Sequence, residues 1–227
     1  MSDAESPKSR AVTYIVCGQI FFVLFIGVCV AIHPGIVLKW NEGGVSNYGI
    51  HVKTALPYTL ALGLLAIYSR RAAVLYSKSD PVTRRLRRVL TVYSVIVIVM
   101  LFSTYVYSLN HVLRDIHIGF GTVLITFESL AAIWMLVLSR RRAWDSVYLA
   151  TQIVGALLAL VTIVGVLHFL FLAEMLANTG FASILIHTAQ RIALDDRLES
   201  ERPLSRASLP LRRLRLPPMR ADNSIAD

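Results

Sequence analysis

The sequence predicts an all-α polytopic membrane protein, a six-helix transmembrane bundle with both termini cytoplasmic. Of its 227 residues, 56% are hydrophobic and only 16% are charged, which is too apolar for a soluble domain of this length. Apolar runs recur at the length that crosses a bilayer, and basic residues gather in alternate connections between them. The same composition excludes a disordered chain, and two cysteines are too few for a disulfide-stapled module.

Hydropathy identifies the spans, because a helix needs roughly 20 apolar residues to cross about 30 Å of hydrocarbon. One run is interrupted by His51, Lys53 and Pro57 near one end, where a lysine reaches the head groups and a proline is tolerated in the first turn. We count this run as a span. The expected spans cover residues 11–32, 50–69, 89–109, 116–138, 147–167 and 169–191.

The sixth span depends on charge, since the polar residues between Glu174 and Gln190 make its hydropathy marginal. With six spans, all but three of the 23 basic residues fall on one side, and the positive-inside rule assigns that side to the cytoplasm. The expected organisation is therefore a cytoplasmic N-terminus over residues 1–10, a membrane domain over 11–194 and a disordered basic cytoplasmic tail over 195–227. The dominance of arginine over lysine suggests a bacterial protein of the plasma (inner) membrane.

Membrane lipids are the expected partners, because basic residues cluster where a span meets the cytoplasmic surface. Each basic residue near an anionic surface contributes about 1 kcal/mol of attraction. The clusters expected to meet anionic head groups are Arg84, Arg85, Arg87 and Arg88, and the tail from Arg202 to Arg220. The same charges also serve simply to fix orientation. Since topology accounts for the net charge of +9, we do not expect nucleic-acid binding.

Glu128 is the outstanding polar residue within a predicted span. An ionisable side chain near the membrane midplane costs a few kcal/mol on insertion scales, so it is a candidate functional site. One interpretation is a proton or ligand site. The other is a neutral glutamate that hydrogen-bonds a neighbouring helix through Gln19, Gln152 or a serine.

A second group of polar residues is expected on the extracytoplasmic side. The glycine-rich connection over residues 34–53 predicts tight turns and a loop that folds back over the mouth of the bundle. Together with the starts of the fourth and sixth spans, this loop would form a polar pocket. The candidate pocket residues are Ser46, Asn47, Tyr48, His111, Asp115, His117, His168, Glu174 and Asn178.

The loop carries a resemblance to a known family. Residues Val45-Ser46-Asn47-Tyr48-Gly49, followed by Pro57 and an apolar run, resemble the signature after the first span of a six-span family of lipid-remodelling and autophagy-modulator proteins and related bacterial domains. Asn110, His111 and His117 in the fourth span, and Glu174, His187 and Ala189 in the last, are similar to that family too. Asn47 stands where the family usually has aspartate. The resemblance implies a membrane protein of lipid handling, with no defined reaction.

Three functions remain open. The favoured one is recognition, organisation or traffic of envelope lipids through the extracytoplasmic pocket. The second is a metal-dependent intramembrane hydrolase that uses His111, Asp115 and His117, although their spacing is no established ligand motif, so we assign no metal ligand. The third is a small proton-coupled transporter centred on Glu128. We assign no catalytic residue and expect no cofactor.

Overall fold

The computed structural model describes residues 6–38, 43–77, 80–137, 143–163 and 169–200, and these residues form helices without any strand. Six of the helices are long and apolar enough to cross a membrane, which confirms the predicted fold class. The long helices are α1 Pro7–Ile32, α4 Val52–Leu75, α5 Pro81–Val106, α6 His111–Val137, α7 Ala143–Ile163 and α8 Leu170–Ser200. Two short helices, α2 Gly35–Leu38 and α3 Asn47–Ile50, lie between α1 and α4.

Helix caps move several boundaries away from the hydropathy estimate. Asp80 accepts a hydrogen bond from the Thr83 N–H at 2.9 Å and Pro81 is the first helical residue, so α5 begins eight residues before position 89. Asn110 likewise accepts from the Leu113 N–H at 2.9 Å and starts α6 five residues before position 116. Pro57 lies inside α4, beyond its first turn.

The basic tail also begins later than expected. Helix α8 continues through residue 195 and ends at Ser200, so the expected boundary at 195 falls within a helix. Residues 201–227, which include the Arg202 to Arg220 segment, lie outside the described part of the chain.

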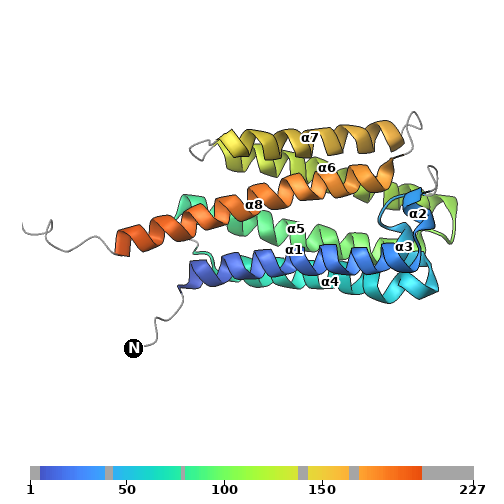
Figure 1. Ribbon diagram of the computed structural model, residues 1–227, viewed down its shortest axis with the longest axis horizontal. Helices are drawn as coiled ribbons and strands as arrows, with labels where there is room; N and C mark the ends of the chain where they lie inside the picture. The colour runs from blue at the N-terminus through green and yellow to red at the C-terminus, as the bar shows by residue number, and fades with distance from the viewer. Residues whose placement is uncertain (1–5, 39–42, 78–79, 138–142, 164–168, 201–227) are drawn as a thin grey trace, which may run out of the picture.

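The long helices run side by side, with α1 against α4, α4 against α5, and α7 against α8 (Figure 1). The start of α1 and the end of α8 lie at one end of the bundle, called here the terminal end, whereas α2 and α3 lie at the other, called the loop end (Figure 1). An even number of spans requires this placement. That the terminal end faces the cytoplasm remains a prediction from the positive-inside rule.

Close backbone approach and a buried ion pair hold α7 on α8. A Cβ atom at Gly155 of α7 would lie 2.3 Å from the backbone nitrogen of Ala177 of α8, so only glycine permits this distance between the helices. Farther along, Arg191 donates to both carboxylate oxygens of Asp145, whose side chain is 2% exposed. These contacts join the last two spans into one unit.

Candidate functional site

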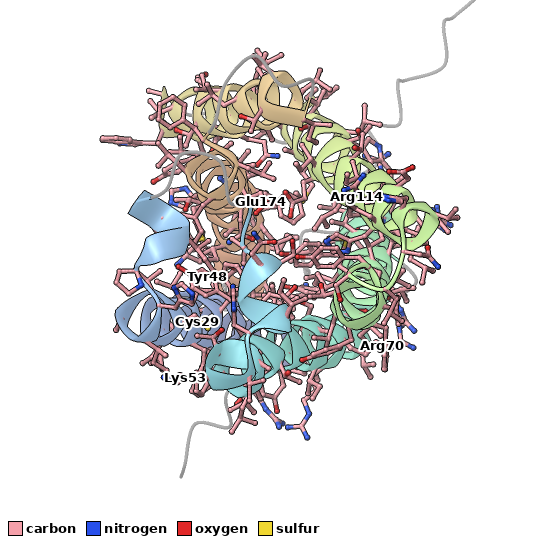
Figure 2. All side chains as sticks on the ribbon, turned by 90° about the vertical axis from the view of Figure 1, so that its right-hand side faces the viewer. Cys29, Tyr48, Lys53, Arg70, Arg114 and Glu174 are labelled. Atoms are coloured by element: carbon pink, nitrogen blue, oxygen red, sulfur yellow. The ribbon has the colours of Figure 1, made fainter. Side chains whose placement is uncertain are left out.

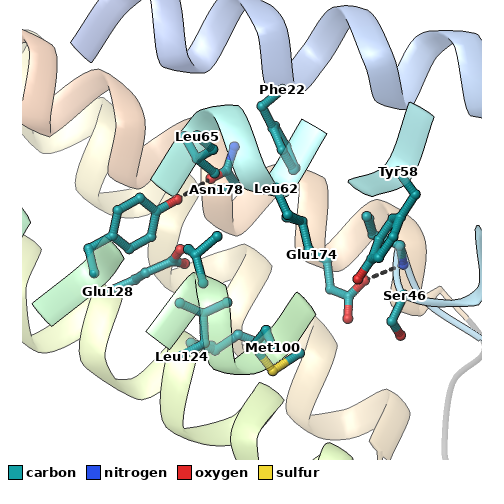
Figure 3. A pocket seen from close by; sticks show the side chains of 14 residues that line it. Phe22, Ser46, Tyr58, Leu62, Leu65, Met100, Leu124, Glu128, Glu174 and Asn178 are labelled. Carbon is teal, nitrogen blue, oxygen red and sulfur yellow. Dashed lines mark hydrogen bonds between the residues drawn. The ribbon is translucent and has the colours of Figure 1, made fainter. Parts of the chain in front are cut away.

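An internal cavity of about 80 Å³ lies between α1, α4, α5, α6, α8 and the segment before α3 (Figure 3). Much of its lining is apolar, and a smaller set of side chains brings polar groups into it. The polar lining residues are Ser46, Tyr58, Tyr93, Glu128, Glu174 and Asn178. Because one water needs roughly 10–15 Å³ by a comparable measure, the cavity has room for several waters or one small solute.

Glu174 connects this cavity to the loop end. Its Oε2 accepts a hydrogen bond from the Val45 N–H at 2.5 Å, across 129 residues of sequence (Figure 3). Seen from the loop end, Glu174 lies near the middle of the ring of helices, whereas Lys53 and Arg114 lie on its rim (Figure 2). The segment before α3 therefore folds back over the bundle and contacts the last span, as its glycines predicted.

Glu128 lies deeper in the same cavity and is only 3% exposed. Gln152 of α7 is its hydrogen-bonding neighbour, and the Gln152 Nε2 also donates to Ser129 at 3.3 Å. The Gln152 Oε1 is buried and has no hydrogen-bond partner within the described ranges. Of the three partners considered from sequence, Gln152 is the one that the structure brings to Glu128.

A chain of side-chain hydrogen bonds crosses the bundle beside the two glutamates. The Tyr93 hydroxyl donates to Asn178 Oδ1 at 3.1 Å, and Asn178 Nδ2 donates to Gln19 Oε1 at 3.4 Å. This chain ties α5 to α8 and α8 to α1. Since Asn178 is 9% exposed and Glu174 lines the cavity, both residues face the bundle interior.

Asn47 and His117 belong to a second cluster at the loop end. The Tyr107 hydroxyl donates to Asn47 Oδ1 at 2.6 Å, and its ring stacks on His117 with centroids 4.6 Å apart. His117 Nδ1 and Ser103 Oγ lie 2.8 Å apart. Tyr107 follows the end of α5, and burial raises its pKa, with Glu174 adding to the effect, so the hydroxyl stays a neutral donor. This cluster anchors the segment before α4 to α5 and α6.

The remaining pocket candidates that the structure describes do not line the cavity. His111 and Asp115 are exposed, whereas His117 is buried. All three residues lie in α6, and a helix turns about 200° between Asp115 and His117, so these two side chains lie on different faces. The grouping of His111, Asp115 and His117 is therefore wrong. Tyr48 is buried against Phe171 and is absent from the cavity lining. His168 lies outside the described residues.

The structure gives the metal-dependent alternative no site among the residues that it describes. Within those ranges, no group of three His, Cys, Asp or Glu side chains could hold a metal ion. Two cavity residues, Tyr58 and Tyr93, were missing from the candidates. Their positions inside spans, away from the belts where tyrosine is common, were the signal that sequence offered.

The arginine cluster of α5 divides into two environments. Arg84, Arg87 and Arg88 share a surface pocket with Arg70 of α4. Arg85 instead lies over the ring of Trp134, with its guanidinium carbon 5.6 Å from the ring centroid. The four arginines expected to act together therefore face different neighbours.

No protein-family model, curated protein or solved structure matches this chain. The likeness of residues 45–49 to the lipid-remodelling family remains a prediction from short motifs.

Proposed function

We propose that the protein is a small proton-linked membrane carrier in which Glu128 and Glu174 take up and release a proton inside the bundle. The observation that carries this proposal is the shared cavity: two carboxyl groups from α6 and α8 line it, and none of its described lining residues is a lysine, arginine or histidine. Of the three functions open from sequence, it is the one that this geometry supports best.

The charge of the Glu128 and Glu174 carboxyl groups determines how costly it is to bury them. A carboxylate in an apolar interior is costly unless a cation or several donors compensate it. The other titratable groups that line the cavity are the neutral phenols Tyr58 and Tyr93. Two ionised carboxylates would also repel one another across so small a volume. Binding a proton is therefore the simplest way for the pair to lose charge.

The hydrogen bond between Val45 and Glu174 supplies a way to link that proton to motion. An ionised carboxylate is a stronger acceptor for a backbone N–H than a protonated one. Protonation of Glu174 would thus weaken the hold on the segment before α3 and open the cavity toward the loop end. Water or one small solute could then enter or leave the cavity.

The volume also bears on the favoured lipid function. The cavity lies among the helices and has room for several waters or one small solute, so it favours a proton or small-solute site over a phospholipid site. A lipid-binding role needs a different surface of the protein.

Proton flux into liposomes tests the proposal. The full chain is reconstituted with an entrapped pH dye, and an inward proton gradient is imposed. We expect faster acidification than in protein-free liposomes, and its loss in Glu128→Gln. Asp115→Asn, which removes an exposed carboxyl outside the cavity, is the matched control and should behave as the parent protein.

An infrared measurement separates proton binding from transport. A protonated buried carboxyl group gives a C=O stretch that Glu128→Gln should remove. Unchanged flux in Glu128→Gln would contradict the carrier, and an unchanged infrared band would contradict the proton site itself.

A further inference from the structure

A basic pocket opens at the terminal end of the bundle, between α4 and α5. Arg70, Arg84, Arg87 and Arg88 line it, together with Thr91 and Val92, around a volume of about 510 Å³. Among the described lining residues there is no aspartate or glutamate. Four guanidinium groups from two helices therefore face one space.

Two of these guanidinium groups are held in position by neighbours. Arg70 Nη1 donates to Thr91 Oγ1 at 3.1 Å, and Arg87 Nη1 donates to the backbone oxygen of Tyr76 at 3.3 Å. Each of these two planar guanidinium groups has further N–H donors that can bind an anion. Arg84 and Arg88 are exposed at the pocket.

An apolar groove of about 320 Å³ continues from this pocket along α5 and α6. Arg88 and Val92 line both spaces, so the two are joined. The far wall of the groove includes Phe127, Leu130 and Trp134. Leu130 is 62% exposed on a helix that spans the membrane by length and composition, so the groove opens toward lipid.

We propose that this joined surface binds one anionic glycerophospholipid. Its phosphate would lie on Arg70, Arg84 and Arg88, and one acyl chain would lie along the groove past Leu130. Guanidinium groups bind phosphate oxygens through paired, charge-assisted hydrogen bonds. Trp134 beside Arg85 marks the head-group level, where amphipathic aromatic rings gather.

The apolar groove argues for a lipid over a free anion. A soluble phosphate would use the arginines alone and would gain nothing from the adjoining groove. An amphiphile satisfies both halves of the surface at once, and the bilayer supplies it at high local concentration. The site does not depend on the carboxyl cavity or on the proposed carrier function.

Native mass spectrometry of the full chain in neutral detergent tests this site. The probes are phosphatidylglycerol, phosphatidylcholine and inorganic phosphate, each added separately and then in competition. We expect retained phosphatidylglycerol, weaker retention of phosphatidylcholine, and little competition by inorganic phosphate. At about fivefold per arginine, Arg84→Gln with Arg88→Gln should weaken phosphatidylglycerol binding roughly 25-fold.

Two further variants define what would overturn the inference. Arg71→Gln removes an exposed charge from the same end of α4 but outside the pocket, and should leave binding within about twofold. Leu130→Trp fills the groove and should weaken phosphatidylglycerol binding without altering the helical signal in circular dichroism. An equal loss of phosphatidylglycerol binding in Arg71→Gln would mean diffuse electrostatic attraction. Full competition by inorganic phosphate would mean a site for the anion alone. Unaltered binding in Leu130→Trp would mean that no acyl chain lies in the groove. Each of these results overturns the proposal.

Discussion

Gly44 lies directly against the carboxylate of Glu174: a Cβ atom at residue 44 would stand 2.3 Å from Glu174 Oε2. A side chain at residue 44 would force the Glu174 carboxylate to move away from the Val45 N–H that it binds. The glycine is needed here for close approach.

Gly44→Ala is therefore predicted to break the bond between Val45 and Glu174. The lost contact and the displaced segment should lower the free energy of unfolding by about 1–3 kcal/mol, the range for a buried polar group left without its partner. Amide hydrogen exchange over residues 43–50 measures the local effect. Gly63→Ala, where nothing lies within 4 Å of the added Cβ, is the control and should leave that exchange unchanged.

Glu128→Gln is predicted to preserve folding, whereas Glu128→Ala is not. The glutamine keeps a hydrogen-bonding side chain beside Gln152, whereas alanine takes away the neighbour with which Gln152 forms a hydrogen bond. We expect Glu128→Ala to cost about 1–3 kcal/mol and to lower abundance in the membrane. Thermal unfolding in detergent compares the two variants. Equal stability of alanine and glutamine variants would place Glu128 in contact with water.

Breaking the Asp145–Arg191 pair is predicted to be costly. Asp145→Ala removes the carboxylate that Arg191, whose side chain is 18% exposed, binds, and removal of one member of a buried pair costs roughly 3–5 kcal/mol. Asp196→Ala is the matched control, since its bond to Lys8 joins side chains that are 36% and 29% exposed and should contribute about 1 kcal/mol or less. Unfolding in a denaturant series measures both. A similar loss of unfolding free energy in both variants would show that the Asp145–Arg191 pair is as weak as the Asp196–Lys8 pair.

The cap of α5 is predicted to make stability depend on pH. The hydrogen bond from the Thr83 N–H lowers the pKa of Asp80 below its ordinary value of 3.8, so the ionised cap stabilises the fold above that value. Stability is then lost as pH falls through the lower, native pKa. Asp80→Ala should cost about 1 kcal/mol at neutral pH and progressively less below pH 3.8. Melting temperatures of the parent protein and Asp80→Ala between pH 7 and pH 3 measure this difference. A difference that stays constant over this range would show that the Asp80 cap is not the source of the pH dependence.

Hydropathy and charge together predicted the six spans, because membrane insertion depends on the same two properties. Caps were harder to recognise: Asp80 and Asn110 start α5 and α6 within segments that look like connections. The position of the arginine pocket between α4 and α5 could not be predicted, since Arg70 approaches Arg84 only after these two helices have packed together.

The sequence predicted the candidate site only in part, because some of its contacts also form only when the helices pack together. Ser46, Glu174 and Asn178 meet because each lies at the loop end or on an inward helix face, both of which follow from the sequence. Asp115 and His117 separate because they lie within a helix, where sequence proximity does not put side chains on one face. Tyr93 joins Asn178 across 85 residues, and only helix packing brings them together.

The position of α8 has a consequence for how the protein is made. Helix α8 lies against both α1 and α6 and supplies Glu174 and Asn178, yet it follows the other described helices in the chain. Until it inserts, Gln19 in the first span lacks its amide partner, and the segment at Val45 lacks its acceptor. Insertion of the earlier helices alone therefore leaves these polar groups without the partners that α8 brings.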